Sequence, residues 1–157
     1  MRKNLTSNKK NKEASYLGHV SQNTVDVLAG RIEDILVKQK RYKDKTYSAK
    51  KLCEELKTNT RYISVTFHRK YNMNYTSFVN RLRIIEAMEI LGNPQNANMR
   101  MQEISDCIGF SNPQSFYSSF KRITKVSPKT YKETFENIGF IPQYGKPTDK
   151  IKGNTSI

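Results

Sequence analysis

The sequence predicts an all-α protein of about seven helices, in which two helix-turn-helix units are joined by a long central helix. Three observations predict this fold. Apolar residues recur at helical spacing between Thr24 and Phe140. A short helical segment, a polar turn and a second helical segment occur in that order twice. One longer segment, apolar around most of its circumference, lies between the two occurrences.

The first predicted helix begins at Thr24, after a polar segment rich in Lys and Asn. Leu28, Ile32 and Leu36 recur along it with acidic residues between them, which indicates an amphipathic helix. A basic connector over 38–45 follows. Residues 1–23 and 141–157 lack an apolar period, so we expect a domain over 24–140 between a disordered basic arm at 1–23 and a flexible tail at 141–157.

The first helix-turn-helix unit is predicted from Ser48, which can cap a short helix carrying Leu52 and Leu56 on one side. The polar residues 57–59 interrupt the pattern, and a second helix then carries Ile63 and Phe67. This order of short helix, tight turn and second helix is typical of a helix-turn-helix.

The central helix is predicted from Asn74, a capping residue, to about Leu91. Asn72 ends the preceding helix, because Asn tolerates the left-handed backbone found at helix C-termini. The residues Gly92-Asn93-Pro94 end the central helix.

The second unit repeats the pattern of the first. A short helix over 101–108 is followed by a turn at 109–112 and a helix carrying Phe116 and Phe120. A final helix begins at Ser127-Pro128, with Ser as the cap and Pro at the first helical position. The apolar anchors of the two units correspond at a displacement of about 52 residues, the second turn being one residue longer: Leu52, Leu56, Ile63 and Phe67 match Ile104, Ile108, Phe116 and Phe120.

Repeated anchors alone could reflect chance helix packing, but the polar faces argue for a common role. In the second helix of each unit, the residues on the side opposite the apolar anchors include no carboxylate. Basic residues follow at the helix ends, as a surface that faces phosphates needs. The outward residues of the first unit are Thr60, Arg61, Ser64, Val65 and His68, those of the second are Pro113, Gln114, Tyr117, Ser118 and Lys121, and the candidate phosphate contacts are Arg69, Arg122, Lys125 and Lys129.

Three of these side chains suit particular bases. The Arg61 guanidinium fits the O6 and N7 acceptors of guanine, and the Gln114 amide fits N6 and N7 of adenine. Val65 is apolar on an outward face, which contact with a thymine methyl group would explain. Contact with phosphate alone is the alternative, since half or more of protein–DNA hydrogen bonds go to the backbone.

The net charge supports a polyanionic partner. The chain has 157 residues with 28 Lys+Arg against 14 Asp+Glu, a formal charge of +14. Nucleic acid and an acidic membrane surface both fit this charge, and the charge alone does not distinguish them. No apolar run approaches the ~20 residues of a membrane span. With no secretion signal in the sequence, we expect a cytoplasmic protein.

Cysteine and histidine residues indicate no metal site or other cofactor. Cys53 and Cys107 lie among apolar residues of predicted helices, so we expect two small buried side chains. His19 and His68 have no partner at metal-ligand spacing.

The length of the central helix suggests how the two units could be used together. About 18 residues span roughly 27 Å, and successive major grooves on one side of B-DNA lie ~34 Å apart. One chain is therefore expected to read two successive grooves as a monomer.

The residues also resemble the DNA-binding domain of the AraC/XylS family of bacterial transcription regulators. The most specific part of the resemblance is the Gly109-Phe110 turn, the Phe116-x3-Phe120-Lys121 run and Ser127-Pro128-x2-Tyr131-Lys132; Arg83-x3-Ala87-x2-Ile90-Leu91 also matches. The resemblance implies double-stranded DNA as partner and activation through RNA polymerase. The chain departs from the family at four positions. Three positions that are usually glycine in the family are Lys57, Asn72 and Lys125 in this chain, and a position for a small residue in the second unit is Ser105.

Only about 23 residues precede the first predicted helix, so the resemblance is to short members without an effector-binding domain. A basic RNA- or ribosome-associated protein is the alternative, although it would favour aromatics on a sheet or Arg-rich loops. An enzyme is not expected, because the sequence has no phosphate loop and no nucleophile with a plausible base.

Overall fold

The computed structural model describes residues 20–138, which form seven α-helices and no strand. This confirms the predicted all-α fold. Most of the predicted arm, residues 1–19, and the whole predicted tail lie outside the described residues. The chain divides into two compact units, the first comprising residues 20–39 and 47–78 and the second residues 40–46 and 79–138.

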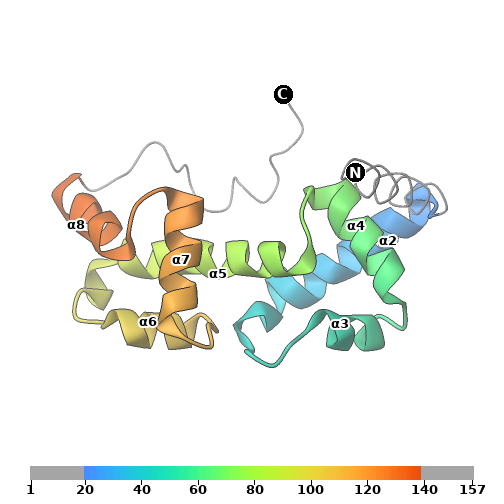
Figure 1. The fold of residues 1–157 in the computed structure, drawn as a ribbon, viewed down its shortest axis with the longest axis horizontal. Helices are drawn as coiled ribbons and strands as arrows, with labels where there is room; N and C mark the ends of the chain where they lie inside the picture. Colours follow the sequence, from blue (N-terminus) through green and yellow to red (C-terminus); the bar gives the residue numbers. More distant parts are fainter. Residues whose placement is uncertain (1–19, 139–157) are drawn as a thin grey trace, which may run out of the picture. The chain divides into compact units, whose positions relative to one another are not determined.

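The first unit contains α2 (Gln22–Glu33), which continues through a π-helical segment (Asp34–Lys38), then α3 (Ala49–Glu55), α4 (Thr60–Tyr71) and the start of α5 (Tyr75–Leu91) (Figure 1). Polar caps begin these helices. Ser21, Ser48 and Asn59 each accept a hydrogen bond from the backbone N–H three residues later. Helix α2 starts two residues before the predicted Thr24, because Ser21 supplies its cap.

The core of the first unit is built on the predicted anchors. Leu52, Leu56, Ile63 and Phe67 are between 0 and 3% exposed. The Phe67 ring packs edge-on against Phe78, with ring centroids 5.3 Å apart. Helix α2 packs against α4, so α4 is covered on a second side as well as on the side of α3.

The second unit contains the rest of α5, α6 (Met101–Cys107), α7 (Pro113–Thr124) and α8 (Pro128–Ile138). Asn112 caps α7, and Ser127 caps α8 ahead of Pro128 as predicted. Cys107 is exposed and not buried as expected, because it ends α6 on the side away from the core. One core joins these helices, and its buried members are Ile84, Ala87, Met88, Leu91, Ile104, Ile108, Phe110, Phe116, Phe120 and Tyr131.

Most of the basic connector, residues 40–45, is a structural part of the second unit. Lys43 Nζ lies 2.7 Å from a carboxylate oxygen of Glu86, the Tyr42 hydroxyl donates to the other oxygen, and Lys45 Nζ pairs with Asp106 at 2.8 Å. Burial alone would raise the pKa of Glu86, but the hydrogen bonds from Lys43 and Tyr42 outweigh it and hold that pKa below its ordinary value. Positive charge in this segment is therefore partly neutralised within the fold.

The turn between α6 and α7 fits tightly against this connector. Gly109 has a φ of +91°, a conformation that side chains rarely adopt. A Cβ atom at Gly109 would lie 2.4 Å from the Lys43 carbonyl oxygen. Arg83 donates from Nε to the Tyr42 carbonyl at 2.7 Å, and its guanidinium lies over the Phe110 ring, 5.4 Å from the centroid. The glycine of the Gly-Phe turn is thus required by both backbone conformation and space.

Candidate nucleic-acid interface

Helix α4 exposes a narrow polar arc opposite its buried anchors. Thr60, Arg61, Ser64 and His68 are all exposed on it, while Ile63 is buried. An open groove of about 770 Å³ runs along one side of this arc, between α4, α3 and residues 72–75. The groove is lined by more apolar than polar surface, so the polar surface on this side of the first unit is the arc itself.

The structure corrects the prediction for Val65. This side chain is only 3% exposed and packs in a small apolar cluster with Val20 and Val25, flanked by Tyr62. The sequence pattern of α4 indicates one buried side, but α2 packs against a second flank of the helix, where Val65 lies. Val65 is therefore a packing residue, and its apolar character needs no thymine contact.

Helix α7 exposes the corresponding face in the second unit. Gln114, Tyr117, Ser118 and Lys121 are exposed, and Pro113, at the first helical position, is partly buried. Tyr117 and Val27 are the two exposed large hydrophobic side chains among the described residues. The Tyr117 ring is 37% exposed and also packs edge-on against Phe116, with ring centroids 5.6 Å apart, so part of an aromatic ring is exposed beside the polar residues of α7.

The four predicted phosphate contacts, Arg69, Arg122, Lys125 and Lys129, are exposed. Arg69 has a structural contact as well, because its Nη1 donates to the carbonyl oxygen of Val20 at 2.8 Å. A guanidinium carries five N–H donors, so this bond leaves others for a phosphate.

The candidate helices α4 and α7 contain no carboxylate side chain. No Asp or Glu occurs in α4 or α7, and each has basic residues in its last turn. The acidic side chains beside α4 lie on α2, where Asp26 pairs with Lys70 and Glu33 accepts a hydrogen bond from Tyr71 at the C-terminal end of α4. Further acidic residues lie on α3 and α6, for example Glu54 and Glu103. This segregation leaves each candidate face open to a polyanion.

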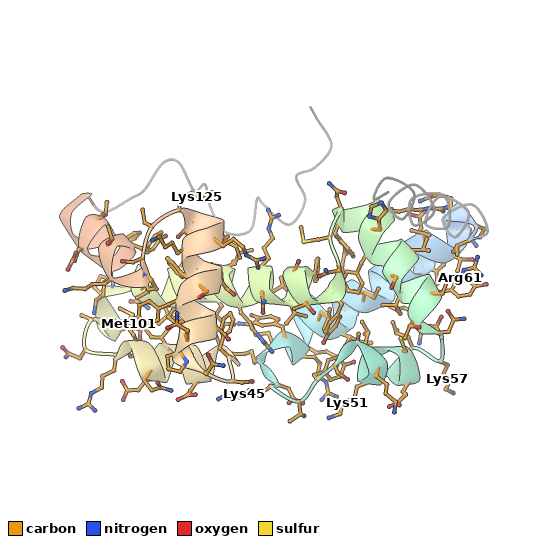
Figure 2. The ribbon with its side chains drawn as sticks, in the orientation of Figure 1. Lys45, Lys51, Lys57, Arg61, Met101 and Lys125 are labelled. Carbon is orange, nitrogen blue, oxygen red and sulfur yellow. The ribbon has the colours of Figure 1, made fainter. Side chains whose placement is uncertain are left out.

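Left-handed backbone occurs where the sequence lacks the family's glycines. Lys57, Asn72 and Lys125 have φ angles of 51°, 51° and 67°. Lys57 lies in the turn between α3 and α4, and Lys125 ends α7 (Figure 2). Lysine at such a position stores roughly 1–2 kcal/mol of strain, and both lysines present a cation next to a candidate face.

Comparison with known proteins identifies the arrangement. A family model described as a helix-turn-helix domain matches residues 52–134, from within α3 to within α8. The chain belongs to this AraC-type helix-turn-helix family. The match covers α4, α5, α6 and α7 completely, and it agrees with the resemblance given by the Gly-Phe turn and the Ser-Pro start of α8.

A curated relative of the family supports the assignment. The Bacillus subtilis (strain 168) protein named "Uncharacterized HTH-type transcriptional regulator YisR" is 30% identical over 95 residues, or 60% of this chain and 32% of the relative. The chain thus spans about a third of that relative's length.

Two solved structures share the fold. The C-terminal domain of the two-component response regulator yesN from Fusobacterium nucleatum has a TM-score of 0.57 at 21% identity, covering 71% of this chain and 99% of that domain. The C-terminal domain of AraT, a response regulator from Geobacillus stearothermophilus, has a TM-score of 0.58 at 20% identity, covering 74% and 88%.

Other kinds of site find no support in residues 20–138. No group of three or more His, Cys, Asp or Glu side chains in that range could hold a metal ion. None of the helices described is both long and apolar enough to cross a bilayer.

Proposed function

We propose that this protein is a transcription regulator that binds duplex DNA sequence-specifically, with α4 and α7 as its recognition helices. The observation that carries the proposal is the pair of carboxylate-free helices, each with an exposed polar arc held on fully buried anchors. A helix of this kind fits the major groove, where base edges present distinct donors and acceptors. Membership of the helix-turn-helix family supports the same function.

The base contacts are assigned to exposed side chains near the start of each helix. Arg61 on α4 is the guanine contact, and Gln114 on α7 is the adenine contact. The remaining predicted residues of the two helices contribute further base and sugar contacts: Thr60, Ser64 and His68 on α4, and Pro113, Tyr117, Ser118 and Lys121 on α7. Arg69, Arg122, Lys125 and Lys129 contact phosphates.

A single chain carries both recognition helices, which favours binding as a monomer. We expect one chain to occupy an asymmetric site of about 20 base pairs, reading two major-groove segments about 10 base pairs apart. In this proposal RNA polymerase is the protein partner through which transcription is activated. Competition of duplex DNA against RNA for the protein separates this function from RNA binding, and RNA should compete poorly.

Two substitutions test base reading. Arg61→Ala and Gln114→Ala should each weaken binding to the preferred duplex by about 1–3 kcal/mol and relax preference at one base pair. Titrations of specific and random duplexes with each variant measure both effects. Lys129→Ala is the control, since loss of a phosphate contact weakens binding to all sequences alike. Equal losses on specific and random duplexes for Arg61→Ala or Gln114→Ala would show that the residue contacts only phosphate.

Substitution of Lys125 should separate stability from binding. Lys125→Gly relieves the left-handed strain and should raise the free energy of unfolding by about 0.5–1 kcal/mol, since the more flexible unfolded chain offsets part of the gain. It should also weaken binding to every duplex, because a cation is lost. Lys125→Ala removes the same charge without relieving the strain, so it should lower affinity equally and leave stability unimproved. Thermal unfolding and duplex titration of both variants check this, and unchanged affinity in both would remove Lys125 from the interface.

A further inference from the structure

The two candidate recognition helices differ in how far one of their flanks is covered. Both contain 12 residues and follow a capping asparagine, Asn59 for α4 and Asn112 for α7. Alignment from these caps therefore pairs each residue of one helix with one residue of the other. The buried anchors then coincide, for example Ile63 with Phe116, so differences in exposure at other positions reflect the elements packed around each helix.

Helix α2 packs along one flank of α4 (Figure 1). Tyr62, Val65 and Arg69 are three and four residues apart, so they form one stripe along this flank. Tyr62 is half-buried and Val65 is 3% exposed, and both pack against the cluster of Val20 and Val25. The Arg69 guanidinium donates to the carbonyl oxygen of Val20 at 2.8 Å. The middle of this stripe is therefore closed to a ligand.

The last turn of α4 is also bound to α2. The Lys70 ammonium pairs with the Asp26 carboxylate, and the Tyr71 hydroxyl donates to the Glu33 carboxylate at 3.2 Å. The hydrogen bond from Lys70 holds the pKa of Asp26 below its ordinary value. Polar contacts as well as apolar packing thus fix α2 against α4, and the covered flank is a stable feature of the first unit.

The corresponding flank of α7 is open. Ser115, Ser118 and Arg122 occupy the positions of the covered stripe, and all three are exposed. Ser118 is the exposed counterpart of the buried Val65. A serine hydroxyl can both donate and accept a hydrogen bond, so it can pair with base edges in a major groove. The second unit therefore offers polar side chains at positions that packing occupies in the first unit.

The continuous exposed stripe is consequently wider on α7 than on α4. At about 100° per residue, the stripe of α4 runs from Thr60 to Arg61 and spans roughly 100°, because the buried Val65 ends it. The stripe of α7 runs from Tyr117 to Ser115 and spans roughly 160°. Direct readout needs a side chain at each base edge that is read, so the wider stripe can specify more base pairs.

We propose that the two half-sites of the duplex are read unequally, with α7 specifying more base pairs than α4. This inference rests on the proposed function of the two helices. Ser118 is the additional specificity-determining residue of α7, and Ser115 supports it on the same flank. In the half-site of α4 the flank is given over to packing against α2, so Arg61 carries most of the preference there.

Changing a selected duplex one base pair at a time measures how preference is distributed. The half-site of α4 is the one in which Arg61→Ala relaxes preference. We expect more positions in the half-site of α7 than in that of α4 at which a single change lowers affinity by about tenfold or more. Equal numbers of such positions in the two half-sites, or more in the half-site of α4, would overturn the inference.

A matched pair of alanine variants tests the residues themselves. Ser118→Ala should lower discrimination at one base pair in the half-site of α7 by roughly fivefold. Val65→Ala, at the corresponding position of α4, should leave every base preference unchanged, because the side chain is covered by α2. Thermal unfolding sets a titration temperature at which both variants are folded. An unchanged preference for Ser118→Ala, or a relaxed one for Val65→Ala, would overturn the assignment.

The same titrations separate this inference from the proposed function. If the unmodified chain binds a duplex specifically and its two half-sites carry equal preference, the inference fails and the proposed function stands. If the unmodified chain selects no duplex from random sequences, the proposed function itself fails.

Discussion

Replacing Gly109 by alanine should lower the free energy of unfolding by about 3–5 kcal/mol. The new Cβ would lie 2.4, 2.8 and 2.9 Å from the carbonyl oxygen, carbonyl carbon and Cα of Lys43. These are backbone atoms, so no side-chain rotation relieves the clash. The φ of +91° adds further strain once a side chain is present. Thermal or urea unfolding of Gly109→Ala measures the loss.

A second glycine offers a matched control. Gly30 lies within α2, and a Cβ atom there would meet nothing within 4 Å. Gly30→Ala should therefore raise stability by up to about 1 kcal/mol, because alanine is the better helix former. A Gly109→Ala variant as stable as the original protein would contradict the tight packing of the α6–α7 turn against Lys43 of the connector.

Affinity for duplex DNA should fall on the order of 10³-fold between about 50 and 200 mM salt, provided that six or more phosphates are neutralised. The basis is the excess of 28 Lys+Arg over 14 Asp+Glu and the absence of carboxylates from α4 and α7. Cations bound to DNA are released when lysine and arginine replace them, and added salt opposes that release. Titration of one duplex at several salt concentrations gives the slope.

The salt response has an internal control in the connector. Lys43 and Lys45 pair with Glu86 and Asp106 within the second unit, so Lys45→Gln should change the slope less than Lys121→Gln, which removes an exposed cation from the face of α7. A nearly flat salt response of the unmodified chain would contradict a phosphate-dominated interface.

Local patterns made most of the fold predictable from the sequence. The anchors Ile63, Phe67, Phe116 and Phe120 recur at helical spacing, and each is at most 3% exposed. Caps such as Ser48 act within four residues, so their effect is also local. The exposed arcs of α4 and α7 followed from the anchors, because fixing one side of a helix fixes the opposite side.

The errors arose where a distant segment decides the environment. Val65 is buried because α2 covers a second flank of α4, and no pattern within α4 reports that contact. The sequence of the connector indicates only a basic segment. In the structure, Lys43 and Tyr42 bind Glu86, which is more than 40 residues away in sequence. The sequence does place Glu86 between Ile84-Ile85 and Ala87-Met88, and a carboxylate in such an apolar stretch indicates that a partner packs against it.

A footprint of the chain on a duplex selected from random sequences tests the central claim most directly, when the number of bound chains is measured in the same experiment. We predict one chain per minimal site of about 20 base pairs, with two protected major-groove segments about 10 base pairs apart. Arg61→Ala should relax preference in one segment and Gln114→Ala in the other. Two chains bound to a palindrome, or both variants acting on the same segment, would contradict the claim that one chain reads DNA with both α4 and α7.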